Sequence, residues 1–193
     1  MSKITVILGH PNSKSFNSAI AETYRDTALK AGHDVKYFAL GDMEFDPILH
    51  EGYNKRQNLE PDLQTAIDAV LWADHLVFVF PTWWGTMPAI LKGFFDRAFL
   101  PGLTFKYHEN DPMWDKLLAG KSAHCLITMD TPRWFFSLIY GDPAHKQIKR
   151  TILEFCGVKP VKITNFSEVR YADAKKRVAW LEKVKEIASK TRL

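Results

Sequence analysis

The most constraining feature of the sequence is an apolar run, Leu76-Val77-Phe78-Val79-Phe80, that stops at Pro81. Five consecutive apolar residues rich in valine and phenylalanine indicate a strand buried on both faces, as in the middle of a parallel sheet. Pro81 lacks the N–H that a sheet ladder requires, so the strand ends there, and Pro88 suits the first turn of a helix from Met87 to about Phe99. We therefore expect a strand, a short turn and a helix, with further helices covering both faces of the sheet.

The turn between the two prolines displays Trp83 and Trp84. In open α/β sheets, ligands bind in the crevice beyond the carboxyl ends of the strands, which is where this turn is expected. Two indoles there would form a wall on which a large planar ligand can stack, and the backbone N–H groups of Thr82 to Gly85 could bond its polar edge. The alternative is that the tryptophans only pack beneath a neighbouring loop, because tryptophan side chains are mostly buried in proteins.

Strand and helix patterns alternate along the rest of the chain. Strands are expected at 3–8, 34–40, 76–80, 122–128 and 158–166; helices at 16–31, 62–72, 87–99, 174–188 and from 148 to the stop at 157; and irregular segments at 41–61, 100–118 and 129–136. This alternation predicts an α/β fold, a doubly wound five-stranded parallel sheet with helices on both faces. The length of 193 residues suits one domain, so residues 1–193 are expected to form a single unit.

The loop after the first strand, Gly9 to Asn17, is rich in serine and asparagine. It leads into a helix, whose free N–H groups and positive dipole end favour an anion such as a phosphate. The loop contains neither a Walker motif nor a dinucleotide glycine pattern. Ser15 or Asn17 could also serve only to cap the helix, so the loop by itself leaves both roles open.

Composition and charge exclude several classes of protein. No apolar run approaches the roughly 20 residues that cross a bilayer, and Met1-Ser2-Lys3 leads straight into a strand, so a cytoplasmic protein without membrane insertion is expected. Cys125 and Cys156 show neither metal-ligand nor redox-pair spacing, which predicts reduced thiols and no metal site. The net charge of +4 is spread over dispersed lysines and arginines, and a phosphate-bearing cofactor accounts for it as well as nucleic acid does; no nucleic-acid partner is expected.

Three segments carry a resemblance to a known family: His10 with Ser15-Phe16-Asn17, Pro81-Thr82-Trp83-Trp84-Gly85 with Pro88-Ala89-Ile90-Leu91-Lys92-Gly93, and Phe155-Cys156-Gly157. Over almost the whole chain the sequence resembles the flavodoxin-like NAD(P)H:quinone oxidoreductases, which include DT-diaphorase. The resemblance implies that His10, Ser15, Phe16 and Asn17 bind the phosphate and ribityl chain of a flavin, and that Pro81 to Gly85 hold its isoalloxazine ring. The first loop is similar to that of FAD-binding relatives, which favours FAD over FMN.

The loop after the fourth strand departs from the family pattern. Many relatives carry Thr-Thr-Gly-Gly where this chain has Met129-Asp130-Thr131-Pro132, so these residues must meet the pyrimidine edge of the ring differently. A tyrosine and a histidine that help the transfer in mammalian relatives correspond to Phe136 and Tyr140, across a short deletion. We hypothesise that Arg133 or Tyr140 stabilises the negative charge that builds up on the reduced ring; the alternative for Arg133 is a solvent-facing side chain.

The reaction implied by the resemblance is ping-pong. NAD(P)H passes a hydride to the flavin and leaves, and a quinone or similar aromatic acceptor then takes its place and receives two electrons. Members of the family are typically homodimers whose partner chain completes the acceptor pocket, and Phe105 and Tyr107 match aromatic positions at that interface. Trp134 and Phe136 are expected in the same pocket. The alternative for Phe105 and Tyr107 is packing on their own domain.

Other functions remain open on the sequence alone. A flavodoxin-type one-electron carrier would share the fold but is usually acidic, an azoreductase or nitroreductase would differ only in its acceptor, and a flavin-free binding module is compatible with the same fold. The choice between NADH and NADPH is also open.

Overall fold

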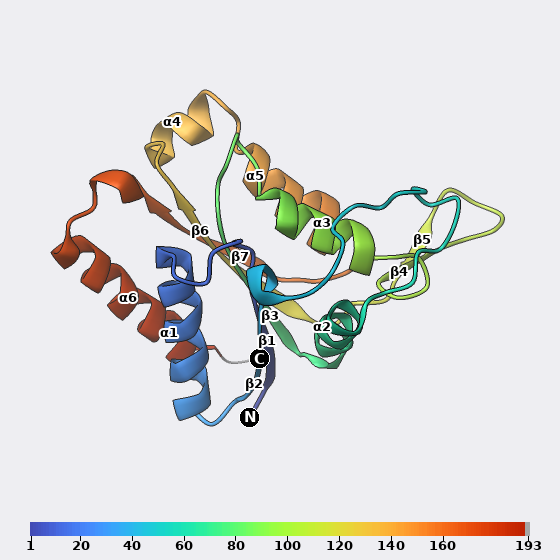
Figure 1. Ribbon diagram of the computed structural model, residues 1–193, viewed down its shortest axis with the longest axis horizontal. Coiled ribbons are helices and arrows are strands. Elements are labelled where there is room, and N and C mark those ends of the chain that lie inside the picture. Colours follow the sequence, from blue (N-terminus) through green and yellow to red (C-terminus); the bar gives the residue numbers. More distant parts are fainter. Residues whose placement is uncertain (192–193) are drawn as a thin grey trace.

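The computed structural model describes residues 1–191 and is built around a five-stranded parallel sheet (Figure 1). The strand order is β2-β1-β3-β6-β7, the doubly wound order of flavodoxin-like sheets. The strands are β1 (Lys3–Leu8), β2 (Asp34–Ala39), β3 (His75–Pro81), β6 (Ser122–Met129) and β7 (Val161–Ser167). The predicted fold class is therefore confirmed, with β3 in the middle of the sheet.

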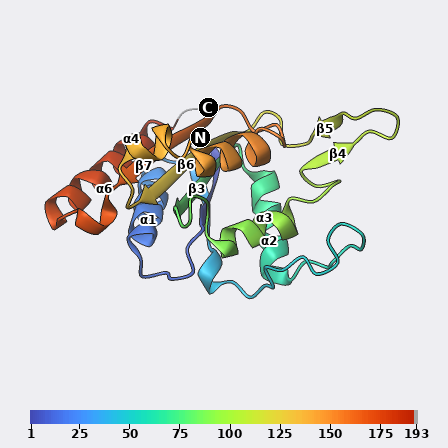
Figure 2. The same cartoon turned by 90° about the horizontal axis from the view of Figure 1, so that it is seen from above.

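Helices cover both faces of the sheet (Figures 1 and 2). One face carries α1 (Phe16–Lys30) and α6 (Ala174–Ser189), and the other carries α2 (Pro61–Trp72), α3 (Ala89–Ala98), α5 (Pro143–Lys146) and the π-helical η2 (Gln147–Leu153). The remaining short helices are η1 (Leu40–Asp42), α4 (Arg133–Leu138) and η3 (Val169–Tyr171). Within residues 1–191, none of the helices combines the length and apolar character that crossing a bilayer requires.

The central strand separates two hydrophobic cores. Successive strand residues point to opposite faces, so Phe78 and Phe80 pack with α2 and α3, whereas Val77 and Val79 pack under α1 and α6. All four side chains are fully buried. Because both faces of this strand are buried, its sequence is a continuous apolar run.

Two segments expected to be irregular contain regular structure. Residues 100–118 include an antiparallel hairpin of β4 (Phe105–Tyr107) and β5 (Trp114–Lys116), whose strands are too short to leave a periodic signal. The segment 129–136 contains the start of α4, which begins after Pro132. The last strand also begins later than expected, at Val161, since Pro160 has no N–H for the ladder.

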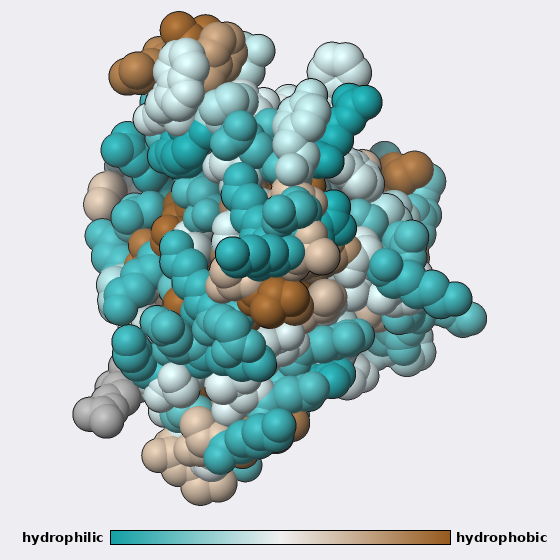
Figure 3. Space-filling model, turned by 90° about the vertical axis from the view of Figure 1, so that its left-hand side faces the viewer, coloured by the Kyte–Doolittle hydropathy of each residue, from teal (hydrophilic) through white to brown (hydrophobic). Residues whose placement is uncertain are grey.

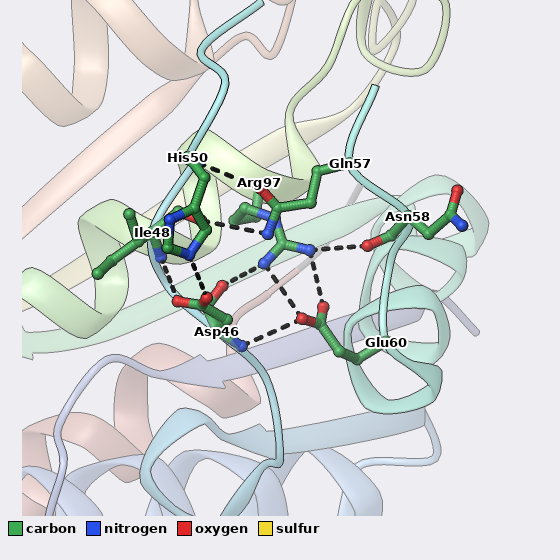
Figure 4. A network of polar contacts seen from close by, with 7 residues as sticks. All are labelled: Asp46, Ile48, His50, Gln57, Asn58, Glu60 and Arg97. Atoms are coloured by element: carbon green, nitrogen blue, oxygen red, sulfur yellow. Dashed lines mark hydrogen bonds and ion pairs between the residues drawn. The ribbon is translucent and has the colours of Figure 1, made fainter. Parts of the chain in front are cut away.

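A single buried side chain fixes the path of the irregular segment 43–60. Arg97 of α3 is completely buried, and its guanidinium donates hydrogen bonds to the backbone carbonyls of Asp46 and Asn58 and to the carboxylate of Glu60 (Figure 4). Burial raises the pKa of Glu60, but the hydrogen bond from Arg97, backbone N–H donors and the charge of Arg97 together outweigh it and hold the pKa below its usual value. Charge-assisted hydrogen bonds of this kind tie a segment without repeating structure to the helix layer.

Candidate functional site

Three loops meet beyond the carboxyl ends of the central strands: residues 9–15 after β1, 82–88 after β3 and 130–132 after β6. The chain leaves β1 toward α1 on one face and leaves β3 toward α3 on the other. Neighbouring strands whose connections diverge in this way open a crevice between their loops, which is the ligand position of doubly wound sheets.

Direct contacts tie the three loops together. The backbone N–H of Thr82 donates to the carbonyl of Thr128 over 2.7 Å, and the Thr128 hydroxyl donates to the side-chain oxygen of Asn17 over 3.1 Å. The rings of His10 and Trp83 meet edge to face, with centroids 5.5 Å apart. The three loops therefore form one structural unit, although they lie far apart in the sequence.

The first loop presents donors to an anion. Ser15 is the N-cap of α1 and accepts a hydrogen bond from the N–H of Ser18, so the capping role that the sequence allowed is real. The backbone N–H groups of Phe16 and Asn17, in the first turn, have no partner within the helix. The Nδ1 atom of His10 accepts from the N–H of Asn12 over 2.9 Å, which leaves the ring proton on Nε2, and partial burial lowers the pKa of His10.

The side chains of Phe16 and Asn17 are used inside the fold. Phe16 packs against Trp180 of α6, with ring centroids 5.9 Å apart, and the buried Asn17 bonds Thr128. Their backbone N–H groups lie at the loop end of the helix, in its first turn. The helical spacing of Phe16, Ile20 and Tyr24 is the sequence signal for the inward position of Phe16.

The second loop is a tight turn that exposes its tryptophans. Trp83 and Thr86 exchange two backbone hydrogen bonds, and Trp84 and Gly85 between them have φ angles of +51° and +80°. Positive φ at both central positions is the type I′ geometry, which suits Gly85 and strains Trp84. Trp84 is fully exposed and Trp83 is 43% exposed, so the alternative that both pack beneath a loop is wrong.

A cavity of about 680 Å³, named here the carboxyl-edge cavity, lies between the second and third loops. Its lining comprises Thr82, Trp84, Gly85, Met129, Thr131, Phe136, Ile139, Tyr140 and Pro143. The Thr82 hydroxyl is buried and has no hydrogen-bond partner among residues 1–191. An unpaired buried hydroxyl is costly unless a ligand bonds it. An aromatic wall, an unpaired hydroxyl and the backbone N–H groups of Trp84 and Gly85 fit a planar heteroaromatic ring with polar edges, as a flavin has. The N–H groups of Thr82 and Trp83, which the sequence also offered to the ring, are instead bonded to the carbonyls of Thr128 and Thr86.

The predicted residues of the third loop are divided between this cavity and the protein surface. Met129, Thr131, Phe136 and Tyr140 line the cavity. Asp130 instead accepts the N–H of Arg170, and Trp134 is largely exposed. Figure 3 shows an apolar patch over α4, where Leu138 and Ile139 are exposed beside this rim. Ile139 and Pro143 were not expected in the cavity. The neighbouring helices α4 and α5 are too short to leave a periodic pattern in the sequence.

Arg133 is held by an acidic partner. Its guanidinium forms a bidentate pair with Asp142, which also accepts from the hydroxyl of Ser137. Burial raises the pKa of Asp142, but the hydrogen bonds from Arg133 and Ser137 outweigh it and hold the pKa below its usual value. Arg133 does not line the carboxyl-edge cavity, whereas Tyr140 does, so only one of the two proposed charge-stabilising residues borders it.

Phe105 and Tyr107 lie elsewhere, in a second cavity of about 560 Å³ beside the β4–β5 hairpin, on the far side of α3 from α4 (Figure 1). Phe105 is buried against Phe155, with ring centroids 5.0 Å apart, which agrees with the alternative that it packs on its own domain. Tyr107 is exposed. One chain therefore does not bring this pair together with Trp134 and Phe136. We call this the hairpin cavity; its lining also includes Tyr53, which sequence reasoning missed because the segment 43–60 lacks a pattern.

Known proteins are similar to this chain in sequence and fold. A family model described as flavodoxin-like fold matches residues 2–188. An uncharacterized NAD(P)H oxidoreductase of Haemophilus influenzae is 31% identical over 182 residues, covering 92% of this chain and 89% of that protein. The NAD(P)H dehydrogenase (quinone) 1 of Cavia porcellus is 33% identical over 177 residues, covering 79% of this chain and 63% of that enzyme.

A solved structure agrees with these matches. The crystal structure of Smu.1420 from Streptococcus mutans UA159 superposes with a TM-score of 0.84 at 35% identity, covering 97% of this chain and 99% of that one. The family model and the Haemophilus relative each span nearly all of the chain. The chain therefore belongs to the flavodoxin-like family of NAD(P)H oxidoreductases and quinone reductases.

Proposed function

We propose that the protein is a flavin-dependent NAD(P)H oxidoreductase that reduces quinones or similar aromatic acceptors by two electrons in a ping-pong reaction. The observation that carries the proposal is the unpaired buried hydroxyl of Thr82 beside the exposed indole of Trp84, in a cavity at the carboxyl ends of β3 and β6. The names of the relatives support the reaction, since the Cavia porcellus protein is an NAD(P)H dehydrogenase (quinone). A cytoplasmic location, where NAD(P)H is available, is part of the proposal.

The chain supplies binding and orientation for the cofactor. A bound flavin would supply hydride acceptance and donation, chemistry that amino-acid side chains lack. The backbone N–H groups of Phe16 and Asn17 and the Nε2–H of His10 would hold its phosphate at the positive end of α1. The Thr82 hydroxyl would bond the edge of the ring. We propose FAD, with FMN as the alternative; FMN is the cofactor named for a Bacillus anthracis azoreductase of the same fold.

Tyr140 is the proposed charge-stabilising residue. It borders the carboxyl-edge cavity, while Arg133 positions the end of α4 through its pair with Asp142. Replacing Tyr140 by Phe is expected to slow reduction of the bound flavin about 10-fold or more in stopped-flow measurements, because a donor to developing negative charge is lost. Arg133→Gln serves as the comparison. Unchanged rates in the double variant Tyr140→Phe/Arg133→Gln would exclude both residues from the mechanism.

The second cavity supports a homodimer. Six of the thirteen residues that line the hairpin cavity are aromatic, and one of them, Tyr107, is exposed in the single chain. In the proposed dimer the exposed Tyr107, next to the buried Phe105 in the hairpin, would complete the acceptor pocket formed by Trp134 of the partner subunit and Phe136 of the partner subunit. Light scattering that shows a stable monomer with full activity would contradict this arrangement.

The visible spectrum of the purified protein tests the function directly. The expected result is a yellow flavin that bleaches on anaerobic addition of NADPH or NADH and recovers with a quinone; the faster donor identifies the preferred nicotinamide, and mass spectrometry of the released cofactor separates FAD from FMN. A bound flavin that neither nicotinamide reduces would favour a one-electron carrier. Reoxidation by an azo or nitro compound but not by quinones would change the acceptor class. Failure to bind flavin in excess would overturn the proposal.

A further inference from the structure

A third cavity, of about 520 Å³, lies at the opposite edge of the sheet from the three loops. It is formed by the amino ends of β3, β6 and β7 and by the last turn of α6, and we call it the amino-edge cavity. Its polar lining side chains include His75, Ser122, His124, Lys159, Lys162 and Lys190. None of these residues belongs to the proposed oxidoreductase site.

Buried polar residues occupy core positions of the sheet here. His75 and Ser122 are opposite each other in the β3–β6 pairing, and His124 is two residues further along the same face. The residues that follow on this face, Val79 and Leu126, are fully buried under α1 and α6. His75 is only 6% exposed and His124 only 8%. Burying polar groups costs free energy unless they are hydrogen-bonded, so their partners decide what this region is for.

The hydrogen bonding of His75 is incomplete. Its Nδ1 atom lies 2.7 Å from the hydroxyl of Ser122, but its Nε2 atom is buried and has no partner within residues 1–191. His124, by contrast, is paired, with Nε2 lying 2.8 Å from the hydroxyl of Thr164. When the Ser122 hydroxyl donates to Nδ1, the proton of His75 is on Nε2. A buried N–H donor then remains for an oxygen of a ligand.

The charge around the amino-edge cavity is positive. Lys159, Lys162 and Lys190 line it, and its lining contains no acidic residue among those described. Burial, followed by the charges of neighbours including Lys162, lowers the pKa of His75 to about 4, and burial and Lys162 do the same for His124. Both imidazoles are therefore neutral at neutral pH, and the ammonium groups set the charge.

Two negative features of α6, within residues 1–191, are weak or partly satisfied, and the carboxylate of Asp74, which precedes His75, accepts the backbone N–H of Lys3. The carboxylate of Glu186 lies 3.8 Å from the ammonium of Lys190, and both side chains are open to solvent. Carbonyls at the end of α6 would repel an anion, but Thr191 donates its N–H to Ala188 and its hydroxyl to Ile187. The positive lining therefore dominates.

We propose that the amino-edge cavity binds a small organic oxyanion, a phosphate ester or a polycarboxylate. The Nε2–H of His75 would be the buried donor, and Lys159, Lys162 and Lys190 would pair with the negative oxygens. The cavity volume is within the range of small-molecule sites. Pro160 and Ile187 provide an apolar wall for the organic part of the molecule.

Calorimetric titration of the flavin-saturated protein with inorganic phosphate and with citrate, at constant ionic strength in potassium chloride, tests this proposal. We expect one site and a shift of the His75 ring resonances in the NMR spectrum. Lys162→Gln is expected to weaken binding about 10-fold or more, since hydrogen bonds to charged groups are lost. Lys183→Gln makes the same charge change on an exposed position of α6 outside the cavity and is expected to leave affinity within about twofold.

The same titration can overturn the proposal. No binding of either anion, or binding that Lys162→Gln leaves unchanged, removes the site. His75→Gln adds a second test if it folds, and the lysine variants and the ring shifts suffice if it does not. Tighter binding of phosphate identifies a phosphate-ester ligand, and tighter binding of citrate identifies a polycarboxylate. Because Lys162 is remote from the first loop, these outcomes can be interpreted even if the protein takes up no flavin.

Discussion

The hydroxyl of Thr128, at the end of β6, donates a hydrogen bond to the side chain of Asn17 in the first turn of α1, over 3.1 Å. Both residues are buried. The family motif presents Asn17 as a cofactor ligand, and this contact gives its side-chain oxygen a structural role while its amide and backbone N–H groups remain for a phosphate.

Asn17→Ala and Thr128→Val are therefore expected to have similar effects. Each leaves one buried polar partner unsatisfied, which lowers the free energy of unfolding by about 1–3 kcal/mol, and each loosens the junction of two cofactor loops. Urea unfolding and flavin titration of both variants measure these effects. A loss of flavin affinity confined to Asn17→Ala would show that the amide contacts the cofactor directly.

The unpaired hydroxyl of Thr82 gives a sharper test of the cofactor site. Thr82→Val keeps the side-chain shape and removes the buried hydroxyl, so the flavin-free protein is expected to be as stable as the parent or about 1 kcal/mol more stable. Flavin affinity is expected to fall by about 10-fold, the loss of one hydrogen bond in a buried site. Fluorescence titration with FAD and FMN provides the measurement; unchanged affinity for both would mean that the hydroxyl has no ligand.

Trp84 is strained and exposed, so it contributes little to folding. Its φ of +51° is a conformation that asparagine tolerates better than tryptophan. Trp84→Asn is expected to preserve the free energy of unfolding or raise it by up to about 1 kcal/mol, and to lower kcat/KM for the quinone several-fold because a stacking surface is lost. Thermal unfolding and steady-state kinetics check the two parts. A large loss of stability would show that the indole packs within the fold.

Arg97 is expected to be essential for stability although it lies outside the site. Arg97→Met removes the partner of two backbone carbonyls and of Glu60, and should cost about 3–5 kcal/mol in urea unfolding. Lys92→Met, which breaks an exposed pair with Asp96 on the same helix, should cost less than about 1 kcal/mol. Equal costs would mean that the Arg97 network in Figure 4 does not anchor the segment 43–60.

His75 and His124 make stability depend on pH. Burial lowers the pKa of each to about 4 in the folded protein, against about 6.5 in the unfolded chain, so between these values the unfolded state binds more protons. Stability is therefore complete above pH 6.5 and falls as the pH drops toward 4, by on the order of 3 kcal/mol for each histidine at most. Denaturant unfolding at a series of pH values in the parent and in His75→Gln/His124→Gln measures this; an unchanged slope in the double variant would contradict it.

Much of the fold around the candidate site was predictable because its signals are local. The prolines at 81 and 88 mark the ends of a strand and a helix, the spacing of Phe16, Ile20 and Tyr24 places α1, and the loops at strand ends follow from the parallel order. Which side chains of those loops line the cavity and which form contacts within the fold was not predictable. Whether Arg133 faces a ligand or Asp142 depends on how the chain turns back over the nine positions that separate them, and no periodic pattern in the sequence predicts that turn.

The sequence by itself determined the fold class and the position of the loops at the carboxyl ends of the strands, because hydrophobic period, proline and glycine act on neighbouring residues. Only the tertiary structure decided which polar groups remain without partners. The unpaired hydroxyl of Thr82 and the unpaired nitrogen of His75 are such groups, at opposite edges of the sheet. Hydrogen bonds between distant segments depend on strand register and helix packing, so a residue's partners are known only once both segments are in place.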